Sequence, residues 1–443
     1  MRGFNPVVSL SVKGYVLNAL LRTVYAILHV FLGRAWKRPL KNFEENPATY
    51  TRKELLYFGY KYYAYPHTEA ETPEQAQHFK TQPYQWVSRH QPESTLSIGG
   101  DLMPYKVLMD ADSTRLWEEA GSFFDADLVF ANLETPMDLS RPPSWVPEVM
   151  LSNMYFNGNE ALWQVFTNQN KGRFDVLSVA NNHMLDQGYE GLEATFEFLS
   201  QKGVMAPGGR KEPEFDPSGY LCVRGGITYG FTAWTYSLNT CIPDTTRPWR
   251  TNLLPLNVPG ADFTPIYREA EALRMAGAEV LVISLHGGNA YQAFPQEHVI
   301  SNYRRIMEQT GAEVIVGTHP HNAQPWEFYR YADPKGSGMK TGLIIYSPGD
   351  FIAYDIFKWC HLPCTYKLGF QRTGQGVQLT AFEPQFWYFG LFEGKEIRLI
   401  HAHRALESDV WRNWPAKNRK EFLELMNFRE RAFPHQSSIF EAS

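Results

Sequence analysis

Cysteine is scarce in this chain of 443 residues, with four copies at positions 222, 241, 360 and 364. Four thiols are too few for the disulfide framework on which small secreted domains depend. Cys360-His361-x-x-Cys364 superficially resembles a metal clip, but no second pair of ligands lies nearby in the sequence. We therefore interpret these cysteines as packed or idle thiols.

Internal repeats are also missing, which excludes solenoids and propellers.

Acidic side chains are absent from the first 43 residues, which carry seven Lys or Arg. The other 400 residues hold the remaining 35 basic side chains and all 47 acidic ones, although the net charge of the whole chain is only −5. Broad nucleic-acid binding needs a basic surface that displaces counterions, so we expect no nucleic-acid partner for this acidic body. The basic and apolar N-terminus instead favours an anionic, flat partner such as a membrane surface.

Residues 15–32 form the most hydrophobic stretch, and their apolar side chains recur at helical spacing. Asn18, Arg22 and His29 fall on one narrow polar strip of that helix. Three alternatives remain: an amphipathic helix at a membrane surface, a helix docked on protein, and a membrane span. The charge of Arg22 in the middle of the segment disfavours a membrane span. No small-residue cleavage site follows, so the segment is not expected to be a removed signal peptide. If the helix does span, the basic residues that follow it would tend to hold the body on the cytoplasmic side. We expect a cytoplasmic protein or one peripheral on the cytoplasmic face of the membrane.

Changes in composition divide the chain into four segments. We interpret residues 1–41 as the basic amphipathic helix and residues 42–94 as an irregular arm with at most one short helix. Residues 95–352 alternate apolar runs with helical patterns, which is typical of an α/β domain. Residues 353–443 are predicted to form a hairpin from 386–391 and 397–402, followed by a helical tail.

Two sets of strands are predicted within the α/β domain. Buried strands are expected at 95–99, 128–131, 176–180, 280–285 and 314–316, with helices at 189–201, 265–276 and 296–309. Strands joined by tight turns are expected at 220–223, 227–234, 326–331 and 343–346. This mixture predicts a sandwich of mixed sheets flanked by helices.

Residues that can bind metal follow the buried strands directly. They are Asp101, Asn132 and Glu134, then Asn181, Asn182 and His183, and finally His286, His319 and His321. Ligands bind beyond the carboxyl ends of strands in open α/β sheets, so we expect these side chains to meet at one edge. Any one of them alone could be a cap or turn residue, but together they indicate a metal centre.

Carboxylates together with imidazoles suit a pair of divalent cations. Two metals about 3.5–4 Å apart need a carboxylate to bridge them and neutral imidazoles to complete each shell. His319 and His321 are one residue apart, so in an extended stretch each could reach one metal. His183 beside such a site could protonate a leaving oxygen.

Several segments, in this order, resemble the poly-γ-glutamate capsule-synthesis (CapA) family, a branch of the calcineurin-like metallophosphoesterase superfamily. The resemblance covers about residues 95–352. Its most specific segments are Ala180-Asn181-Asn182-His183-Met184-Leu185-Asp186-Gln187-Gly188 and Gly317-Thr318-His319-Pro320-His321. Gly100-Asp101, Asn132-Leu133-Glu134, His286-Gly287-Gly288 and Ser347-Pro348-Gly349-Asp350-Phe351 add to it.

The resemblance implies a four-layer αββα sandwich of two mixed sheets, with two divalent metal ions (Mn, Fe or Zn). It implies that Asp101 and His321 serve the first metal, that Glu134 bridges, and that Asn182, His286 and His319 serve the second. It also implies that His183 is the acid, oriented by Asp186, with Asn181 and Arg210 binding an anionic substrate.

Three departures from the family pattern concern the centre itself. Met103 stands where the wider superfamily has a histidine, so the first metal lacks one ligand. The family's H-W-G-x-E-Y is His286-Gly287-Gly288-Asn289-Ala290-Tyr291 here, which loses the tryptophan and the glutamate. Asp350 replaces the family's asparagine and adds a carboxylate.

Two functions from different classes follow from these residues. The first is a metal-dependent hydrolase that acts on a phosphoester or on an anionic polymer such as poly-γ-glutamate in capsule or envelope biosynthesis. The second is a non-catalytic, membrane-associated accessory module of such an assembly system. The basic N-terminal helix and the replacement of the superfamily histidine by Met103 favour this second function. A nucleic-acid phosphodiesterase is disfavoured by the acidic body.

Overall fold

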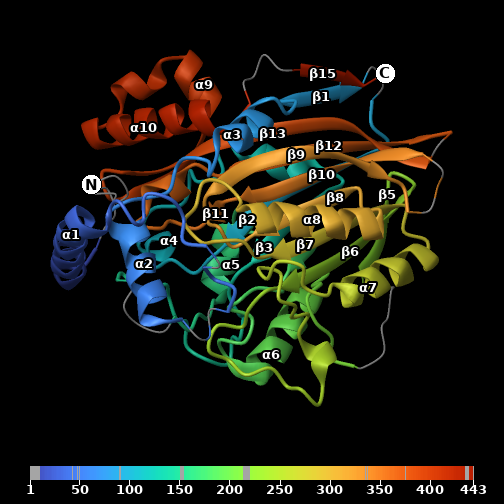
Figure 1. Ribbon diagram of the computed structural model, residues 1–443, viewed down its shortest axis with the longest axis horizontal. Helices are drawn as coiled ribbons and strands as arrows, with labels where there is room; N and C mark the ends of the chain where they lie inside the picture. Colours follow the sequence, from blue (N-terminus) through green and yellow to red (C-terminus); the bar gives the residue numbers. More distant parts are fainter. Residues whose placement is uncertain are drawn as a thin grey trace.

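The computed structural model describes residues 10–442 apart from 42, 47, 49, 89–90, 150–153, 213–219, 335, 337, 375 and 435–438. Two mixed sheets face each other, and helices lie around them (Figure 1). The first nine residues of the predicted 1–41 segment, including Arg2, lie outside the described residues. The predicted α/β class with two mixed sheets is confirmed.

The first sheet joins strands from both ends of the chain. Its order is β15 (Ile439–Ala442), β1 (Gln85–Ser88), β13 (Gly376–Phe392), β12 (Cys364–Thr373), β2 (Ser94–Leu102), β3 (Leu128–Leu133) and β4 (Val176–Ser178), with β11 (Asp350–Ile352) beside β2 and β14 (Glu396–His401) beside β13. The second sheet runs β5 (Leu221–Arg224), β6 (Ile227–Thr235), β7 (Val280–His286), β8 (Val314–Thr318), β10 (Met339–Pro348) and β9 (Ala323–Ala332).

The strands that carry the predicted ligands are parallel neighbours. β2, β3 and β4 pair in parallel in the first sheet, and β6, β7, β8 and β10 do so in the second. Strands buried on both faces need continuous apolar runs, which is why the sequence marks them clearly. Phe130 of β3 stacks on Phe231 of β6, with ring centroids 6.3 Å apart, so the core lies between the two sheets.

The helices predicted within the α/β domain are present at the expected positions. They are α6 (Gly188–Gln201), α7 (Thr264–Met275) and α8 (Glu297–Thr310). Helix α7 packs on β6 and β7, while α8 packs on β9 and β10. A shorter helix, α5 (Glu160–Phe166), begins after Asn159, whose side chain accepts a hydrogen bond from the Leu162 amide.

The segment 42–94 differs from the irregular arm expected from the sequence. It holds α2 (Arg52–Tyr63), α3 (Pro73–Lys80) and strand β1, which joins the first sheet. Thr51 and Glu54 form a reciprocal capping box at the start of α2, and Thr72 caps α3 with Pro73 in its first turn. These capping residues can be recognised in the sequence. The buried face of α2 consists mainly of tyrosines and includes a lysine, so the sequence did not indicate that this face is buried.

The C-terminal segment is also part of the sandwich rather than an extension of it. The predicted hairpin exists as β13 and β14, but β13 is longer and pairs with β12, which pairs in turn with β2. The tail forms α9 (Ala402–Glu407) and α10 (Ala416–Ala432), both of which pack against β13. His361 contacts Glu421 of α10 through one ring nitrogen and the Asp355 carbonyl through the other, so its ring is not free to join Cys360 and Cys364 in a metal clip.

Helix α1 (Val12–Leu32) exposes its apolar side and docks through its polar side. Asn18 is fully buried and donates to the Glu148 carbonyl, while His29 hydrogen-bonds to Tyr60 of α2 at 2.7 Å. Val16, Leu20, Ile27 and Phe31 are instead 61, 58, 56 and 76% exposed. Within the described chain, α1 is the one helix that is long and apolar enough to cross a membrane.

Two glycines allow β11 to lie against the end of β2. A Cβ on Gly100 would lie 1.8 Å from the Gly349 carbonyl oxygen, and Gly349 itself has φ 80°. The Asp101 amide donates to that carbonyl at 3.0 Å. Because this backbone approach is so close, Asp350 is placed in register with Asp101.

We expect Gly100→Ala to lower the free energy of unfolding by about 2 kcal/mol or more, because the new methyl group would separate the two segments. Urea unfolding would measure this, with Gly121→Ala as the matched control, since a Cβ there meets nothing within 4 Å. Equal stability of the two variants would contradict this account of the contact.

Candidate metal centre

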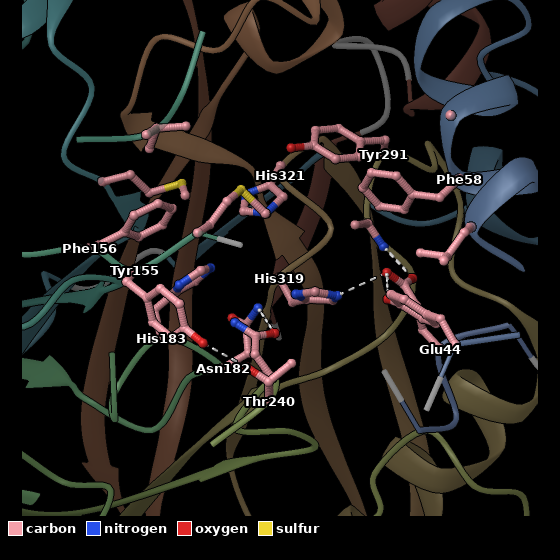
Figure 2. Close-up of a pocket in the computed structure, with 18 of the residues that line it drawn as sticks. Glu44, Phe58, Tyr155, Phe156, Asn182, His183, Thr240, Tyr291, His319 and His321 are labelled. Atoms are coloured by element: carbon pink, nitrogen blue, oxygen red, sulfur yellow. Dashed lines mark hydrogen bonds and ion pairs between the residues drawn. The ribbon is translucent and has the colours of Figure 1, made fainter. Parts of the chain in front are cut away.

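The predicted ligands lie together at the carboxyl ends of the parallel strands. Asp101 is within β2, Glu134 directly follows β3, and His286 ends β7. Asn182 follows β4, and both His319 and His321 follow β8. All six side chains are buried, and Figure 2 shows three of them, Asn182, His319 and His321, at the wall of the neighbouring cavity.

One group of ligand atoms matches the set predicted for the second metal. Glu134, His286 and His319 offer atoms that all lie within 4.8 Å of one another. Nε2 of His286 is 3.6 Å from a Glu134 oxygen and 2.9 Å from the side-chain oxygen of Asn182. The Thr318 hydroxyl lies 2.9 Å from Nδ1 of His286 and fixes the ring from behind.

A second group contains Asp350, a residue that the sequence marked as a departure but did not assign. Asp101, His321 and Asp350 again offer atoms within 4.8 Å of one another. Nδ1 of His321 lies 2.9 Å from Asp350 and 3.6 Å from Asp101. Asp350 thus supplies a third ligand to the group that the methionine at position 103 had left incomplete.

The two histidines of the Gly317–His321 turn reach different groups in a way that the sequence did not predict. We expected an extended stretch, but His319 has φ 96° and His321 has φ 59°, in the left-handed region. Non-glycine residues rarely adopt such values, and they cluster where function imposes them. The turn sends one imidazole to each group of carboxylates, and its rings lie 5.8 Å apart.

The centre holds more buried negative charge than its own side chains can balance. Burial raises the pKa of Asp101 to about 6, and Asp350 adds to the rise. Burial raises the pKa of Glu134 well above its usual value, and Asp101 raises it further. Burial lowers the pKa of His286, His319 and His321, so the imidazoles are neutral at pH 7. Neutral imidazoles beside crowded carboxylates form the donor set that divalent cations bind.

Atoms without partners support the same conclusion. Among the described residues, one oxygen of Glu134, one of Asp350 and Nδ1 of His319 are buried and accept or donate no hydrogen bond. Leaving such groups unpaired is costly unless something else binds them. The residues therefore fit divalent cations.

His183 and Asp186 form a buried pair at the wall of the centre. Nδ1 of His183 lies 2.7 Å from Asp186, which also accepts the Phe156 amide at 2.6 Å. The His183 ring stacks on Phe156 with centroids 4.0 Å apart (Figure 2). Since Nδ1 is engaged, Nε2 is the ring atom left for proton transfer.

Neither of the two predicted substrate-binding residues is among those that line the cavity. The Asn181 amide donates to the Leu133 carbonyl, and its oxygen accepts the His183 amide, so this side chain shapes the turn. Arg210 is not among the residues that line the cavity beside the centre. Its positive charge acts on Glu269, whose pKa burial nevertheless raises to about 7.

A carboxylate from the N-terminal arm enters the centre, and the sequence did not reveal it. One oxygen of Glu44 lies 3.6 Å from Nε2 of His319, and the other accepts the Ala290 amide at 2.9 Å. Ala290 stands where the family pattern has glutamate, so a distant part of the chain supplies the carboxylate. Glu44 has φ 64°, a strained conformation that its contacts with Ala290 and Lys61 maintain.

Lys61 of α2 keeps Glu44 charged. Its ammonium is fully buried, donates to the Ala290 carbonyl and lies 3.8 Å from Glu44. Burial alone would raise the pKa of Glu44, but Lys61 and His319 lower it below its usual value. An ionised Glu44 favours a proton on Nε2 of His319, which leaves Nδ1 free to bind a cation.

We expect Glu44→Gln to weaken divalent-metal binding by about 10- to 100-fold, because His319 loses the carboxylate that orients it. Competition with a fluorescent chelator would measure the affinity. Glu45→Gln is the matched control, since Glu45 is the next residue and belongs to none of the metal-binding groups found among the described residues. Unchanged affinity in Glu44→Gln would show that Glu44 has no such role.

Comparison with known proteins agrees with this geometry. Residues 95–355 match the family described as bacterial capsule synthesis protein PGA_cap. The chain is 26% identical over 265 residues to the PGA biosynthesis protein CapA of Bacillus subtilis (strain 168), covering 58% of this chain and 62% of that protein. It is 24% identical over 233 residues to the capsule biosynthesis protein CapA of Bacillus anthracis, covering 52% and 51%. The chain thus spans less than two thirds of either relative.

Two solved structures share 12% identity with the chain. The calcineurin-like phosphoesterase YfkN of Bacillus subtilis matches with a TM-score of 0.36 over 77% of this chain and 98% of that one. The sulfate thiohydrolase SoxB of Thermus thermophilus, in complex with glycerol, matches with a TM-score of 0.37 over 77% and 62%. The family match covers more than half of the chain and includes every predicted metal ligand: the chain belongs to the bacterial capsule synthesis protein family PGA_cap.

Proposed function

We propose that the protein is a metal-dependent hydrolase that cleaves a phosphoester during the assembly of a capsule or envelope polymer. The observation that carries this proposal is the pair of buried ligand groups at the parallel strand ends. When bound there, two cations such as Mn, Fe or Zn would polarise a phosphoryl oxygen and lower the pKa of water. An anionic capsule polymer is the other substrate class that the family suggests.

The residues of the centre have separate roles in this proposal. Asp101, His321 and Asp350 would hold one cation, Asn182, His286 and His319 would hold the other, and Glu134 would bridge them. His183 would hold a proton on Nε2 and give it to the leaving oxygen. Asp186 would keep the His183 ring in that orientation through Nδ1.

We expect the manganese-loaded protein to hydrolyse p-nitrophenyl phosphate or its diester, and a chelator to abolish the reaction. His183→Gln should lower kcat by about 100-fold or more, because the leaving oxygen loses its acid. Metal content should stay unchanged in that variant. His403→Gln, in α9, is the matched control.

Hydrolysis that survives complete removal of metal would contradict the proposal. No turnover of any phosphoester by a fully loaded protein would favour the non-catalytic accessory role instead.

We also propose that α1 lies on an anionic membrane surface. Its polar side is occupied by Glu148 and α2, while its apolar side is exposed along the whole helix. Arg34, Lys37, Arg38 and Lys41 follow the helix and would contact lipid phosphates. A helix held against the protein in this way is suited to the membrane interface rather than to a span.

The double variant Val16→Asp/Leu20→Asp should bind phosphatidylglycerol vesicles at least about tenfold more weakly than the parent, because two apolar side chains no longer enter the interface. Flotation with vesicles would measure this. Val223→Asp is the control, since Val223 is 58% exposed on β5, away from α1. Equal flotation of both variants would refute the membrane role of α1.

A further inference from the structure

A cavity of about 560 Å³ opens beside the metal centre, and most of its wall is apolar. Asn182, His183, His319 and His321 line one end of it. The apolar part of the wall includes Leu55, Leu56 and Phe58 of α2, together with Val146, Met154 and Phe156. Phe58 and Phe156 are labelled in Figure 2. An apolar wall of this extent can cover an apolar part of a ligand, while the few polar groups at one end fix its orientation.

The apolar wall continues to the mouth of the cavity. Leu55 and Leu56 line the cavity and are still 55% and 40% exposed, so they lie where it meets solvent. They share one face of α2 with Gly59, where a Cβ would lie 2.0 Å from the Tyr25 hydroxyl of α1. The missing side chain at Gly59 therefore lets α1 close against this face.

Helix α1 joins the two walls of the cavity. At its N-terminus, the Ser11 amide donates a hydrogen bond to the carboxylate of Glu148 at 2.7 Å. Further along, Tyr25 stacks on Tyr63 of α2 with centroids 5.8 Å apart, and both residues line the cavity. The cavity mouth therefore lies beside the helix whose other side is apolar and exposed.

The charge of the cavity lining disfavours a polyanionic polymer as the substrate. Arg52 is the one Lys or Arg among the described residues that line the cavity. A polymer such as poly-γ-glutamate carries a carboxylate on every unit and would need a row of basic side chains. A ligand with one anionic end and one apolar end fits the lining better.

We propose that the substrate is amphiphilic: a phosphate or pyrophosphate ester whose phosphoryl group sits at the metal centre and whose apolar chain lies along α2 and beside Val146, Met154 and Phe156. This inference rests on the proposed function for the identity of the anionic group. The apolar chain would leave the cavity between Leu55, Leu56 and α1, at the surface proposed to contact the membrane.

Binding of non-hydrolysable alkyl phosphonates to the metal-loaded protein tests the inference. Methyl, butyl and octyl phosphonate would be compared by calorimetry. Affinity should rise about two- to fourfold for each added methylene until the cavity is filled, because each methylene leaves water. The same affinity for all three phosphonates would overturn the proposal.

The double variant Leu55→Asp/Leu56→Asp should remove most of this dependence on chain length. Both side chains are exposed, so the fold does not depend on them. Leu423→Asp, at a leucine that is 37% exposed on α10, should keep the full dependence. Equal dependence on alkyl-chain length in the two variants would also overturn the proposal, because the apolar chain of the ligand would then bind elsewhere.

The outcome is separable from that of the proposed function. If affinity rises with chain length but no ester is hydrolysed, the amphiphile site stands and the hydrolase proposal fails. If simple esters are hydrolysed and affinity does not depend on chain length, the hydrolase proposal stands and the amphiphile site fails.

Discussion

Repulsion among buried carboxylates is the interaction on which the rest of this structure depends. Asp101, Glu134 and Asp350 are all fully buried, and they lie beside imidazoles that burial keeps neutral. Such an arrangement is costly in a protein unless cations or protons neutralise it. The close glycine contact between β2 and β11 and the strained turn after β8 both act to hold these groups together. These features lower the stability of the fold in order to keep the site together, and such local destabilisation is typical of functional sites.

The N-terminal arm links this centre to the surface of the molecule. Glu44 contacts His319 at one end of the arm, and Lys61 of α2 holds Glu44 in place. The same helix presents its leucines to the cavity and packs against α1 through its tyrosines. Helix α1 in turn exposes an apolar side. The proposed metal binding, the shape of the cavity and the proposed membrane contact therefore involve one short segment that lies outside the matched family region.

The α/β domain could be predicted from the sequence because its signals are local. Parallel strands buried on both faces appear as apolar runs, and ligands directly after them fall at one edge of the sheets. Asp101, Glu134, Asn182, His286, His319 and His321 do lie there together. The path of the turn between His319 and His321 was not predictable, since an extended stretch and a left-handed turn both separate the two rings.

Contacts between distant segments left no such signal. Glu44 reaches His319 across the chain, and nothing in its neighbourhood distinguishes it from a surface glutamate. Lys61 is fully buried although lysine is almost never so, because it pairs with Glu44 and lies over the Phe43 ring. For α1, periodicity revealed both faces of the helix but not that the polar one would face the protein. Arg210 was assigned by resemblance alone, and its charge acts on the buried Glu269.

The central claim is that the buried carboxylates and histidines hold two divalent cations. Metal content per chain, measured by plasma mass spectrometry on the parent and on the His319→Ala/His321→Ala double variant, tests it most directly. We predict close to two equivalents of Mn, Fe or Zn in the parent and loss of both in the variant. Metal absent from both proteins after reconstitution, or equal in both, would contradict the account.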